Sequence, residues 1–352
     1  MKKVTRFGVA AGVLAVAAGA ATPAFANGTP AGSTITNNVT VSFQVGGVNQ
    51  NSVSASNSFV VDRKINFVVA EDGSSTTQVS PGQLAAVTSF IVTNSSNAPL
   101  DFALAATNRS GGTAEHGGTD NFDVSNLKLY QDTNNNGTYD AGVDTLITYL
   151  DQVAADASVR VFVLADVPLG RSTGDVAGVR LTGTAAEATA AGSLGATVTQ
   201  TAGANTAGVD TVFADTNAGG NTARDGIHFD EDDYTILAAN LTATKTSRVI
   251  SDPLNGTTNP KLIPGAVVEY CISVSNAAGS ASAANVAISD TLPTTTAYDS
   301  SFGVKVNGTV TSGTCNADGA IAGSHASGVV SGTIPSVVPG DTRTVLFRVT
   351  IN

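Results

Sequence analysis

The sequence predicts an all-β fold of two β-sandwich domains preceded by an N-terminal β-hairpin. Apolar and polar residues alternate with a period of two in many segments, whereas helical periodicity is nearly absent. Gly, Ala, Ser, Thr, Val and Asn dominate, only 13% of the residues are charged, and tryptophan is absent. This composition is typical of secreted β-structure with many turns. A strand pattern near residue 81 also recurs near residue 264, which indicates a duplicated domain.

Residues 1–26 have the pattern of a secretory signal peptide. Lys2, Lys3 and Arg6 precede a short apolar run, and the small-x-small triplet Ala24-Phe25-Ala26 follows it. No later segment approaches the ~20 apolar residues of a spanning helix, so we expect no membrane insertion. No cysteine follows the cleavage site directly and no hydrophobic tail ends the chain, so we expect no lipid or wall anchor. The sequence predicts a secreted protein, extracellular or in the cell envelope of a bacterium.

The chain is acidic. Its formal net charge is −11, and removal of three cations with the signal peptide makes the mature chain −14. Such a surface repels phosphate backbones, and no basic cluster interrupts it, so we expect no nucleic-acid partner. Divalent cations are the natural counter-charge.

Residues 27–64 predict the N-terminal hairpin. In NNVTVSFQV the residues Val39, Val41, Phe43 and Val45 alternate with polar residues, and Gly46-Gly47 then favours a tight turn. We expect the hairpin to complete the chain's own sheet, because this pairing needs no partner. The alternative is strand exchange, in which the hairpin pairs with the open edge of a neighbouring copy.

Residues 65–188 and 241–352 predict the two sandwiches. The segments PGQLAAVTSFIVTN (81–94) and PGAVVEYCISVSN (264–276) share a Pro-Gly opening, an alternating strand and a final asparagine. Residues 189–240 predict a Gly/Ala/Thr-rich linker or a long sandwich loop that ends in an acidic patch. Alternation assigns two sets of side chains to the core of the second sandwich: Val268, Tyr270, Ile272 and Val274; and Val345, Phe347, Val349 and Ile351.

The segment DTNNNGTYDAGVD (132–144) is the candidate metal site. Its spacing suits Ca²⁺, because alternate residues of a tight loop point inward, glycine permits the turn, and hard oxygen ligands match a hard cation. Val143 stands where an EF-hand has a bidentate Glu, so the last ligand must come one residue later, and the flanks read as strands. The alternative is an Asx-rich turn without a metal. The candidate ligands are Asp132, Asn134, Asn136, Thr138 through its carbonyl, Asp140 and Asp144.

Catalysis finds little support in the sequence. His116, His228 and His325 form no two-ligand spacing for zinc, and no nucleophile elbow or phosphate-binding loop is present. The acidic patch is interpreted as a solvated face, since charge runs usually are; it comprises Asp225, Asp230, Glu231, Asp232 and Asp233, with Asp210 and Asp215 upstream. We therefore expect a protein that is not an enzyme.

Cys271 and Cys315 are the two cysteines, and an oxidising compartment favours a disulfide between them. Two unpaired thiols are the alternative.

Residues 241–352 resemble the conserved repeat domain of many bacterial and archaeal cell-surface proteins. The resemblance depends on Thr244 to Thr246, Pro264-Gly265, Asn276 and the strand end Asp290 to Pro293, and residues 65–188 extend it more weakly. It implies an immunoglobulin-like sandwich that serves as a building unit, with no catalytic residues. Cys271 and Cys315 depart from the commoner cysteine-free pattern of that family.

The sequence therefore predicts an exported, non-catalytic structural or adhesive surface protein, stiffened by Ca²⁺ and associating with itself, with other surface proteins or with glycans. The alternative is a calcium-assisted carbohydrate-binding module.

Overall fold

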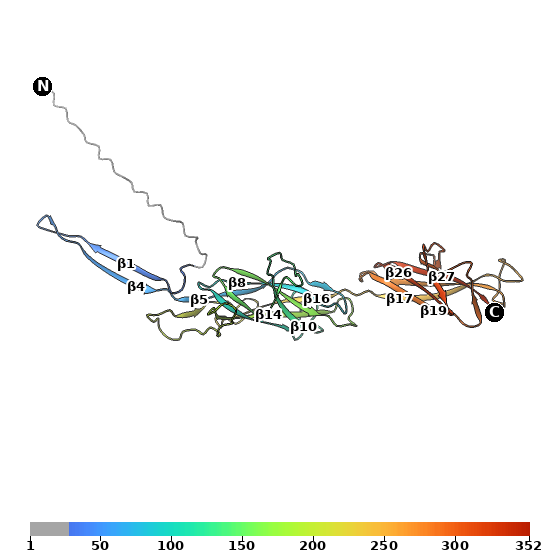
Figure 1. Cartoon of the computed structure of the whole chain (residues 1–352), viewed down its shortest axis with the longest axis horizontal. Coiled ribbons are helices and arrows are strands. Elements are labelled where there is room, and N and C mark those ends of the chain that lie inside the picture. The colour runs from blue at the N-terminus through green and yellow to red at the C-terminus, as the bar shows by residue number, and fades with distance from the viewer. Residues whose placement is uncertain (1–27) are drawn as a thin grey trace, which may run out of the picture.

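The computed structural model describes residues 28–352 and is all-β, as the sequence predicts. The predicted signal peptide lies outside the described residues. A projecting hairpin, a first sandwich and a second sandwich follow one another along the length of the molecule (Figure 1). The described part of the chain contains one short helical element, the 3-10 turn η1 (Ala218–Gly220). None of its helices is long and apolar enough to cross a membrane.

The first sandwich consists of two five-stranded sheets. One has the order β11-β10-β13-β8-β6, with β6 (Phe67–Glu71), β8 (Ala86–Asn94), β10 (Ser125–Gln131), β11 (Thr145–Ile147) and β13 (Ser158–Asp166). The other has the order β12-β9-β14-β16-β7, with β7 (Thr77–Val79), β9 (Leu100–Asn108), β12 (Tyr149–Val153), β14 (Val176–Glu187) and β16 (Ile227–Ile236). A short parallel pair, β5 (Arg63–Ile65) and β15 (Thr211–Phe213), lies beside them. Phe67 and Phe102, 4.7 Å apart between ring centroids, pack in the core between the sheets.

The first sandwich extends further along the chain than the sequence indicates. Residues 189–240 are expected to form a linker or long loop, but β16 pairs with nine residues of β14 and completes a sheet. Tyr234 and Ile236 are fully buried, and the Tyr234 hydroxyl donates a hydrogen bond to the Val163 carbonyl at 3.1 Å. The run of acids in β16 hides its alternation, which is why its sequence reads as a charged loop.

The second sandwich packs a six-stranded sheet against a three-stranded one. The larger has the order β17-β18-β27-β21-β24, with β20 also on β27: β17 (Leu241–Ser251), β18 (Val267–Asn276), β20 (Thr296–Tyr298), β21 (Lys305–Gly308), β24 (Ile321–Ala322) and β27 (Thr342–Ile351). The smaller has the order β19-β26-β25: β19 (Ala283–Thr291), β25 (Ser324–Ala326) and β26 (Val329–Val337). Val345, Phe347 and Val349 of β27 are fully buried, as predicted.

The predicted disulfide is present in this sandwich. Cys271 of β18 and Cys315 are bonded, with their Cα atoms 5.8 Å apart. Cys315 ends the short hairpin β22 (Val310–Thr311) and β23 (Thr314–Cys315). The bond therefore ties this hairpin to the outer face of a central strand.

The two recurring sequence segments occupy equivalent places. Each forms a central strand, β8 or β18, and each strand ends at a buried asparagine. The Asn94 amide donates to the carbonyls of Ala98 and Val153, and the Asn276 amide donates to those of Ala281 and Val337. The two sandwiches share this asparagine-centred corner; that they are related copies stays a prediction.

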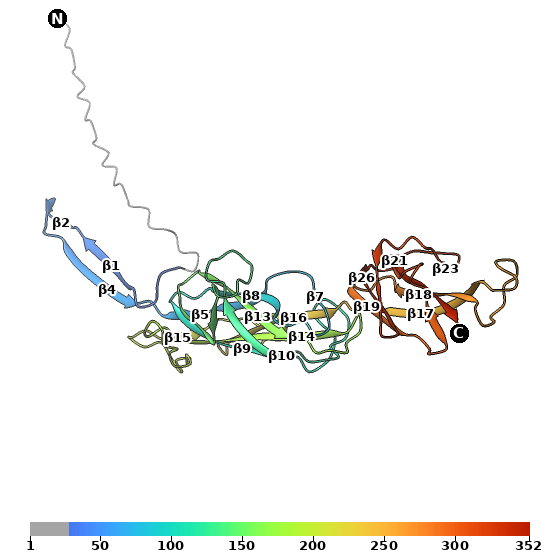
Figure 2. The same cartoon turned by 45° about the vertical axis from the view of Figure 1, so that its right-hand side comes forward.

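Contrary to the expectation from the sequence, the N-terminal hairpin does not pair with a sheet of the first sandwich. Strands β1 (Thr34–Val41) and β4 (Val53–Val60) pair with each other only, and their tip carries β2 (Gln44–Val45) and β3 (Val48–Asn49) around Gly46-Gly47. Both glycines have positive φ angles, 58° and 81°, as the tight turn requires. We expected the hairpin to complete the chain's own sheet; instead it projects beyond the first sandwich (Figure 2).

Candidate functional site

The predicted calcium loop connects β10 to β11, two strands of one sheet, and no helix flanks it. Asp132, only 1% exposed, accepts hydrogen bonds from the backbone N–H groups of Asn136 and Gly137 through its two oxygens. Asp144 closes the loop, because its carboxylate accepts the N–H groups of Thr133 and Asp140 at 3.0 and 2.7 Å. The loop therefore has its two buried acids at its two ends.

Three further predicted ligands meet at one atom. The side-chain amides of Asn134 and Asn136 donate to Asp140 Oδ2 at 3.0 and 2.6 Å, and these bonds lower the pKa of Asp140. The Thr138 N–H donates to the Asn136 side chain. The structure thus brings Asp132, Asn134, Asn136, Asp140 and Asp144 into one hydrogen-bonded loop, which is what an Asx-rich turn requires. Rotation of the two amides by half a turn would present their oxygens to the same centre, which is what a hard cation requires. That rotation would break the hydrogen bonds that these oxygens accept from the N–H groups of Asn136 and Thr138.

Arg160 connects the loop to the body of the sandwich. Its guanidinium contacts Asp72 at 2.5 Å and Asp132 at 3.4 Å, and the hydrogen bond from Arg160 lowers the pKa of Asp72. Gly137, with φ of 78°, lies against the same guanidinium: a Cβ there would be 3.1 Å from Nη1. The positive φ therefore favours glycine here, and a Cβ would also push the guanidinium back by a few tenths of an ångström.

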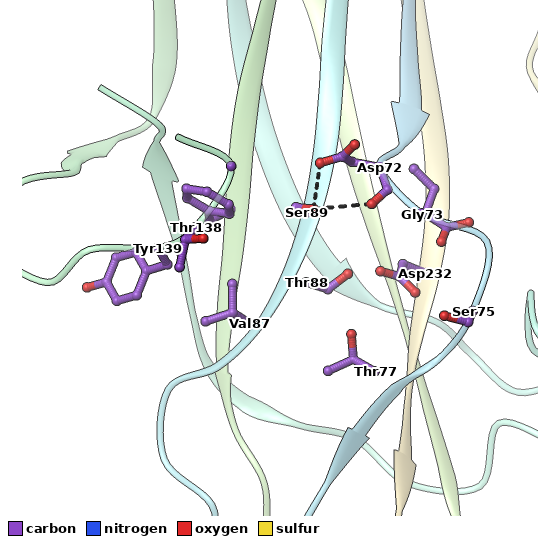
Figure 3. A pocket seen from close by; sticks show the side chains of 13 residues that line it. Asp72, Gly73, Ser75, Thr77, Val87, Thr88, Ser89, Thr138, Tyr139 and Asp232 are labelled. Atoms are coloured by element: carbon purple, nitrogen blue, oxygen red, sulfur yellow. Dashed lines mark hydrogen bonds between the residues drawn. The ribbon is translucent and has the colours of Figure 1, made fainter. Parts of the chain in front are cut away.

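A polar pocket of about 390 Å³ lies beside this loop. Figure 3 shows residues that line it, with Thr138 and Tyr139 on one side and Asp232 on the other. Thr88 of β8, 3% exposed, has no hydrogen-bond partner for its hydroxyl in the described part of the chain. Its side chain is directed toward the Asp232 carboxylate (Figure 3).

Three ligand-type side chains meet at this side of the pocket: Glu71, His116 and Asp232. His116 Nε2 lies 2.9 Å from Glu71 Oε1 and 3.6 Å from Asp232 Oδ1. All three candidate ligand atoms lie within 4.8 Å of one another, and each side chain is at most 14% exposed.

Strand alternation in β16 explains why Asp232 is there. His228 Nδ1 accepts the N–H of Val69, and Asp230 accepts the N–H of Glu71. Alternate side chains of β16 therefore provide hydrogen-bond acceptors for the backbone N–H groups at the edge of β6. Asp232 is the next residue in this series and reaches the end of β6. The neighbouring Asp233 points elsewhere and accepts the backbone N–H of His116 at 2.8 Å, which fixes the loop that carries the imidazole.

The electrostatics of the cluster follow from burial. Burial, together with the charges of Glu71 and Asp233, raises the pKa of Asp232 to about 7, against the opposing effects of the Asp233 N–H and His116. Burial also raises the pKa of Glu71, although His116 opposes it. For His116, burial lowers the pKa, but the nearby carboxylates outweigh it and the net direction is upward.

The structure corrects the interpretation of the acidic patch as a solvated face. Asp210, Asp215, Glu231, Asp232 and Asp233 are all buried. Glu231 is bound by two arginines, Arg109 at 2.8 Å and Arg180 at 2.5 Å. Asp215 accepts the N–H groups of Asp225 and Gly226, so this acid shapes a turn. Most of the patch is therefore structural.

Sequence reasoning missed the Glu71–His116–Asp232 cluster because it searched for local ligand spacing. The three residues come from β6, from the loop after β9, and from β16. The available signal was short: Tyr234 and Ile236 alternate with the polar residues Asp233 and Thr235 at the end of the acidic run, as residues of a strand do. His228 is a buried acceptor of a backbone hydrogen bond, and His325 stacks on Tyr298, so neither belongs to the cluster.

No family model matches the chain, and no curated protein does. The resemblance of residues 241–352 to a cell-surface repeat domain therefore stays a prediction. Solved structures similar to the chain include a "Crystal structure of Putative membrane anchored protein from Corynebacterium diphtheriae". The two share 13% identity over 91% of this chain and 89% of the other, with a TM-score of 0.19. A likeness of that size carries no argument about function.

Proposed function

We propose that this chain is a non-catalytic structural protein of the cell envelope or extracellular space, and that it assembles with copies of itself through its N-terminal hairpin. The observation that carries the proposal is the hairpin itself, an amphipathic two-stranded ribbon that no other part of the described chain covers. The predicted signal peptide and the disulfide support an extracytoplasmic location.

The hairpin has one apolar face. Register places Ile35 opposite Phe59, Asn37 opposite Asn57, Val39 opposite Ala55 and Val41 opposite Val53. Alternation puts these four pairs on one side, which is apolar except for the asparagine pair. The other face carries hydroxyl pairs, Thr36 with Ser58 at 2.8 Å and Thr40 with Ser54 at 3.2 Å. A lone two-stranded hairpin is at best marginally stable in water, so an uncovered apolar face favours association.

The strand edges of the hairpin are unprotected. Natural proteins guard exposed edges with charges, prolines or bulges, yet residues 34–60 contain no charged residue and no proline. Pairing between β1 and β4 is continuous over eight residues. In a mature chain of net charge −14 a neutral ribbon also approaches a second copy without local repulsion.

The second sandwich offers the complementary feature. Its edge strands β17 and β19 each pair with one strand only, and a groove of about 360 Å³ lies between them. Ala243, Ile272, Ala287 and Ile288 contribute apolar surface to this groove, and Lys245 and Asp290 form an ion pair in it at 2.5 Å. We assign the hairpin of one copy to this groove in the next copy.

This assignment predicts an open polymer. The hairpin and the second sandwich lie at opposite ends of the elongated molecule (Figure 1). A head-to-tail contact between different surfaces continues indefinitely unless its rotation closes a ring. The calcium loop has a stiffening role in this proposal, because it joins two strands and lacks the paired helices of a calcium sensor.

The test replaces residues 36–58 with Asn-Gly. The new turn joins Ile35 to Phe59, which already face each other, and keeps the segment at Ala31 that donates to the Asn97 carbonyl of the sandwich. We expect the mature wild-type chain to form concentration-dependent assemblies in light scattering and the shortened chain to stay monomeric. A monomeric wild type, or equal assembly by both chains, would contradict the proposal.

A mixing experiment distinguishes the partner surface. If the hairpin enters the groove, the shortened chain still accepts a hairpin but donates none, so substoichiometric amounts shorten wild-type assemblies. Ala287→Asp in the exposed strand β19 should remove this capping effect. If hairpins pair with hairpins, the shortened chain is inert in the mixture, and the assignment to the groove is wrong.

A further inference from the structure

We propose that Glu71, His116 and Asp232 form a binding site for a first-row divalent transition metal, with Zn²⁺ as its probe. This site lies outside the predicted calcium loop and uses none of its residues. Its existence does not depend on assembly through the hairpin, so the two proposals succeed or fail separately.

The spacing of the three side chains fits a coordination sphere. Metal–ligand bonds of about 2.0–2.2 Å place neighbouring ligand atoms roughly 2.9–3.6 Å apart in tetrahedral or octahedral sites. His116 Nε2 lies 2.9 Å from Glu71 Oε1 and 3.6 Å from Asp232 Oδ1. The third pair lies within 4.8 Å, so a small movement of one carboxylate closes the triangle.

An ion pair between His116 and Glu71 alone would leave two buried polar groups, the Asp232 carboxylate and the Thr88 hydroxyl, with too few hydrogen-bond partners. It leaves the buried Asp232 with the backbone N–H of Asp233 as its hydrogen-bond donor. It also leaves the Thr88 hydroxyl, 3% exposed and directed at Asp232, without a partner in the described chain (Figure 3). Buried hydroxyls are nearly always hydrogen-bonded, so an unsatisfied one calls for a partner such as a water or an ion. A water bound to the metal would satisfy Thr88 and fill the position that the three side chains leave open.

The ligand set selects the class of metal. Imidazole suits zinc, copper, iron and nickel, whereas calcium and magnesium prefer oxygen ligands. Two carboxylates and one imidazole therefore give a site distinct in preference from the oxygen-only loop at Asp132 to Asp144. The surrounding charge is also suitable, because Asp230 and Asp233 add negative charge on either side of Asp232.

The site also has a supporting shell. Asp233 accepts the His116 N–H and positions its loop, and Asp230 accepts the Glu71 N–H. A metal here would join the end of β6, the loop after β9 and β16, so it would fasten the two sheets of the first sandwich at one edge. Its role is structural in the proposal.

The test measures zinc binding by the tag-free mature chain, residues 27–352, after chelator treatment and with excess Ca²⁺ to saturate the loop at Asp132. Titration calorimetry should show one equivalent of Zn²⁺ with micromolar or tighter affinity. His116→Gln and Asp232→Asn should each weaken it at least 30-fold. His325→Gln, in the second sandwich, is the matched control and should leave it unchanged. Co²⁺ should give visible absorption bands that His116→Gln removes.

Thr88→Val provides a variant that is expected to fold, because it is isosteric and removes no hydrogen bond that Thr88 Oγ1 makes in the described chain. We expect about a 10-fold loss of Zn²⁺ affinity from it. Circular dichroism checks the fold of each variant. A wild-type chain without saturable Zn²⁺ binding would overturn the proposal, as would His116→Gln and Asp232→Asn chains that fold and bind within threefold of wild type. Unchanged affinity in Thr88→Val would overturn the place given to the metal-bound water.

Discussion

Two aspartates on the apolar face of the hairpin should abolish assembly at working concentrations. The perturbation is Val39→Asp together with Val41→Asp, which changes one face of β1 and leaves its hydrogen bonds to β4 in place. Both side chains are 54% exposed in the single chain, so the monomer loses little packing. The effect should therefore appear in association and hardly at all in folding.

The magnitude follows from the exposed fractions. Ile35, Val39, Val41, Val53 and Phe59 are between 38% and 61% exposed. Full burial of such a side chain contributes about 1.5–3 kcal/mol, so burying the remaining half contributes about 1 kcal/mol each. Loss of two valines removes about 2 kcal/mol, and burying two carboxylates costs further free energy. Since each 1.4 kcal/mol is tenfold in affinity, the half-assembly concentration should rise at least ~100-fold.

Sedimentation velocity over a concentration series measures this shift. The matched control is Thr36→Asp with Thr40→Asp, which adds the same charge to the hydroxyl face of the same strand. The control should assemble within about threefold of wild type. If both pairs weaken assembly equally, charge alone is responsible and the apolar face is not the contact; if neither does, the hairpin is not the interface.

Three other predictions concern the sandwiches. Ca²⁺ should raise the thermal midpoint of the native chain but not that of Asp132→Ala with Asp140→Ala; coincident melting curves of the native chain with Ca²⁺ and with chelator would reduce the loop to a turn. Burial lowers the pKa of His228, which accepts the Val69 N–H, so the unfolded state binds more protons below about pH 6.5. The free energy of unfolding should fall as the pH drops through that window, by at most about 1.4 kcal/mol per unit, and denaturant titrations of wild type should show this extra slope relative to His228→Gln. Asn276→Ala leaves buried carbonyls without their donor and should cost about 2–4 kcal/mol in denaturant unfolding, whereas a loss below 1 kcal/mol would show that the corner contributes little.

Period-two alternation predicted the strands and the inward faces of the second sandwich, because those features depend on local sequence. It assigned Val345, Phe347 and Val349 to the core, where they lie fully buried. The same alternation places Glu269, which lies between the inward-facing Val268 and Tyr270, on the outer face, and the structure has it there. Yet Glu269 is 2% exposed, because Arg248 and Arg348 from the neighbouring strands cover it. Alternation gives the direction of a side chain, whereas its burial depends on what neighbouring strands place above it.

The candidate sites show the same limit. The loop at Asp132 to Asp144 is contiguous, so its spacing was readable. Glu71 and His116 are 45 residues apart, and Asp232 lies in a different sheet, so only the fold brings them together. The uncovered hairpin was not predictable for a related reason. Alternation in Val39 and Val41 looks the same whether the apolar face meets the chain's own core, another copy or solvent.

Side chains of β16 block the free edge of β6 against pairing with other strands. The N–H groups of Val69 and Glu71 lie at a sheet edge, and His228 and Asp230 already occupy them. A foreign strand that extended this sheet would have to displace an imidazole and a carboxylate and then meet further negative charge. At high protein concentration, the first sandwich therefore resists pairing with a strand of another copy along the edge of β6. The neutral hairpin β1–β4 carries no such block. In the assembly proposed above, the placement of these acids would direct association to the hairpin and away from the edge of β6.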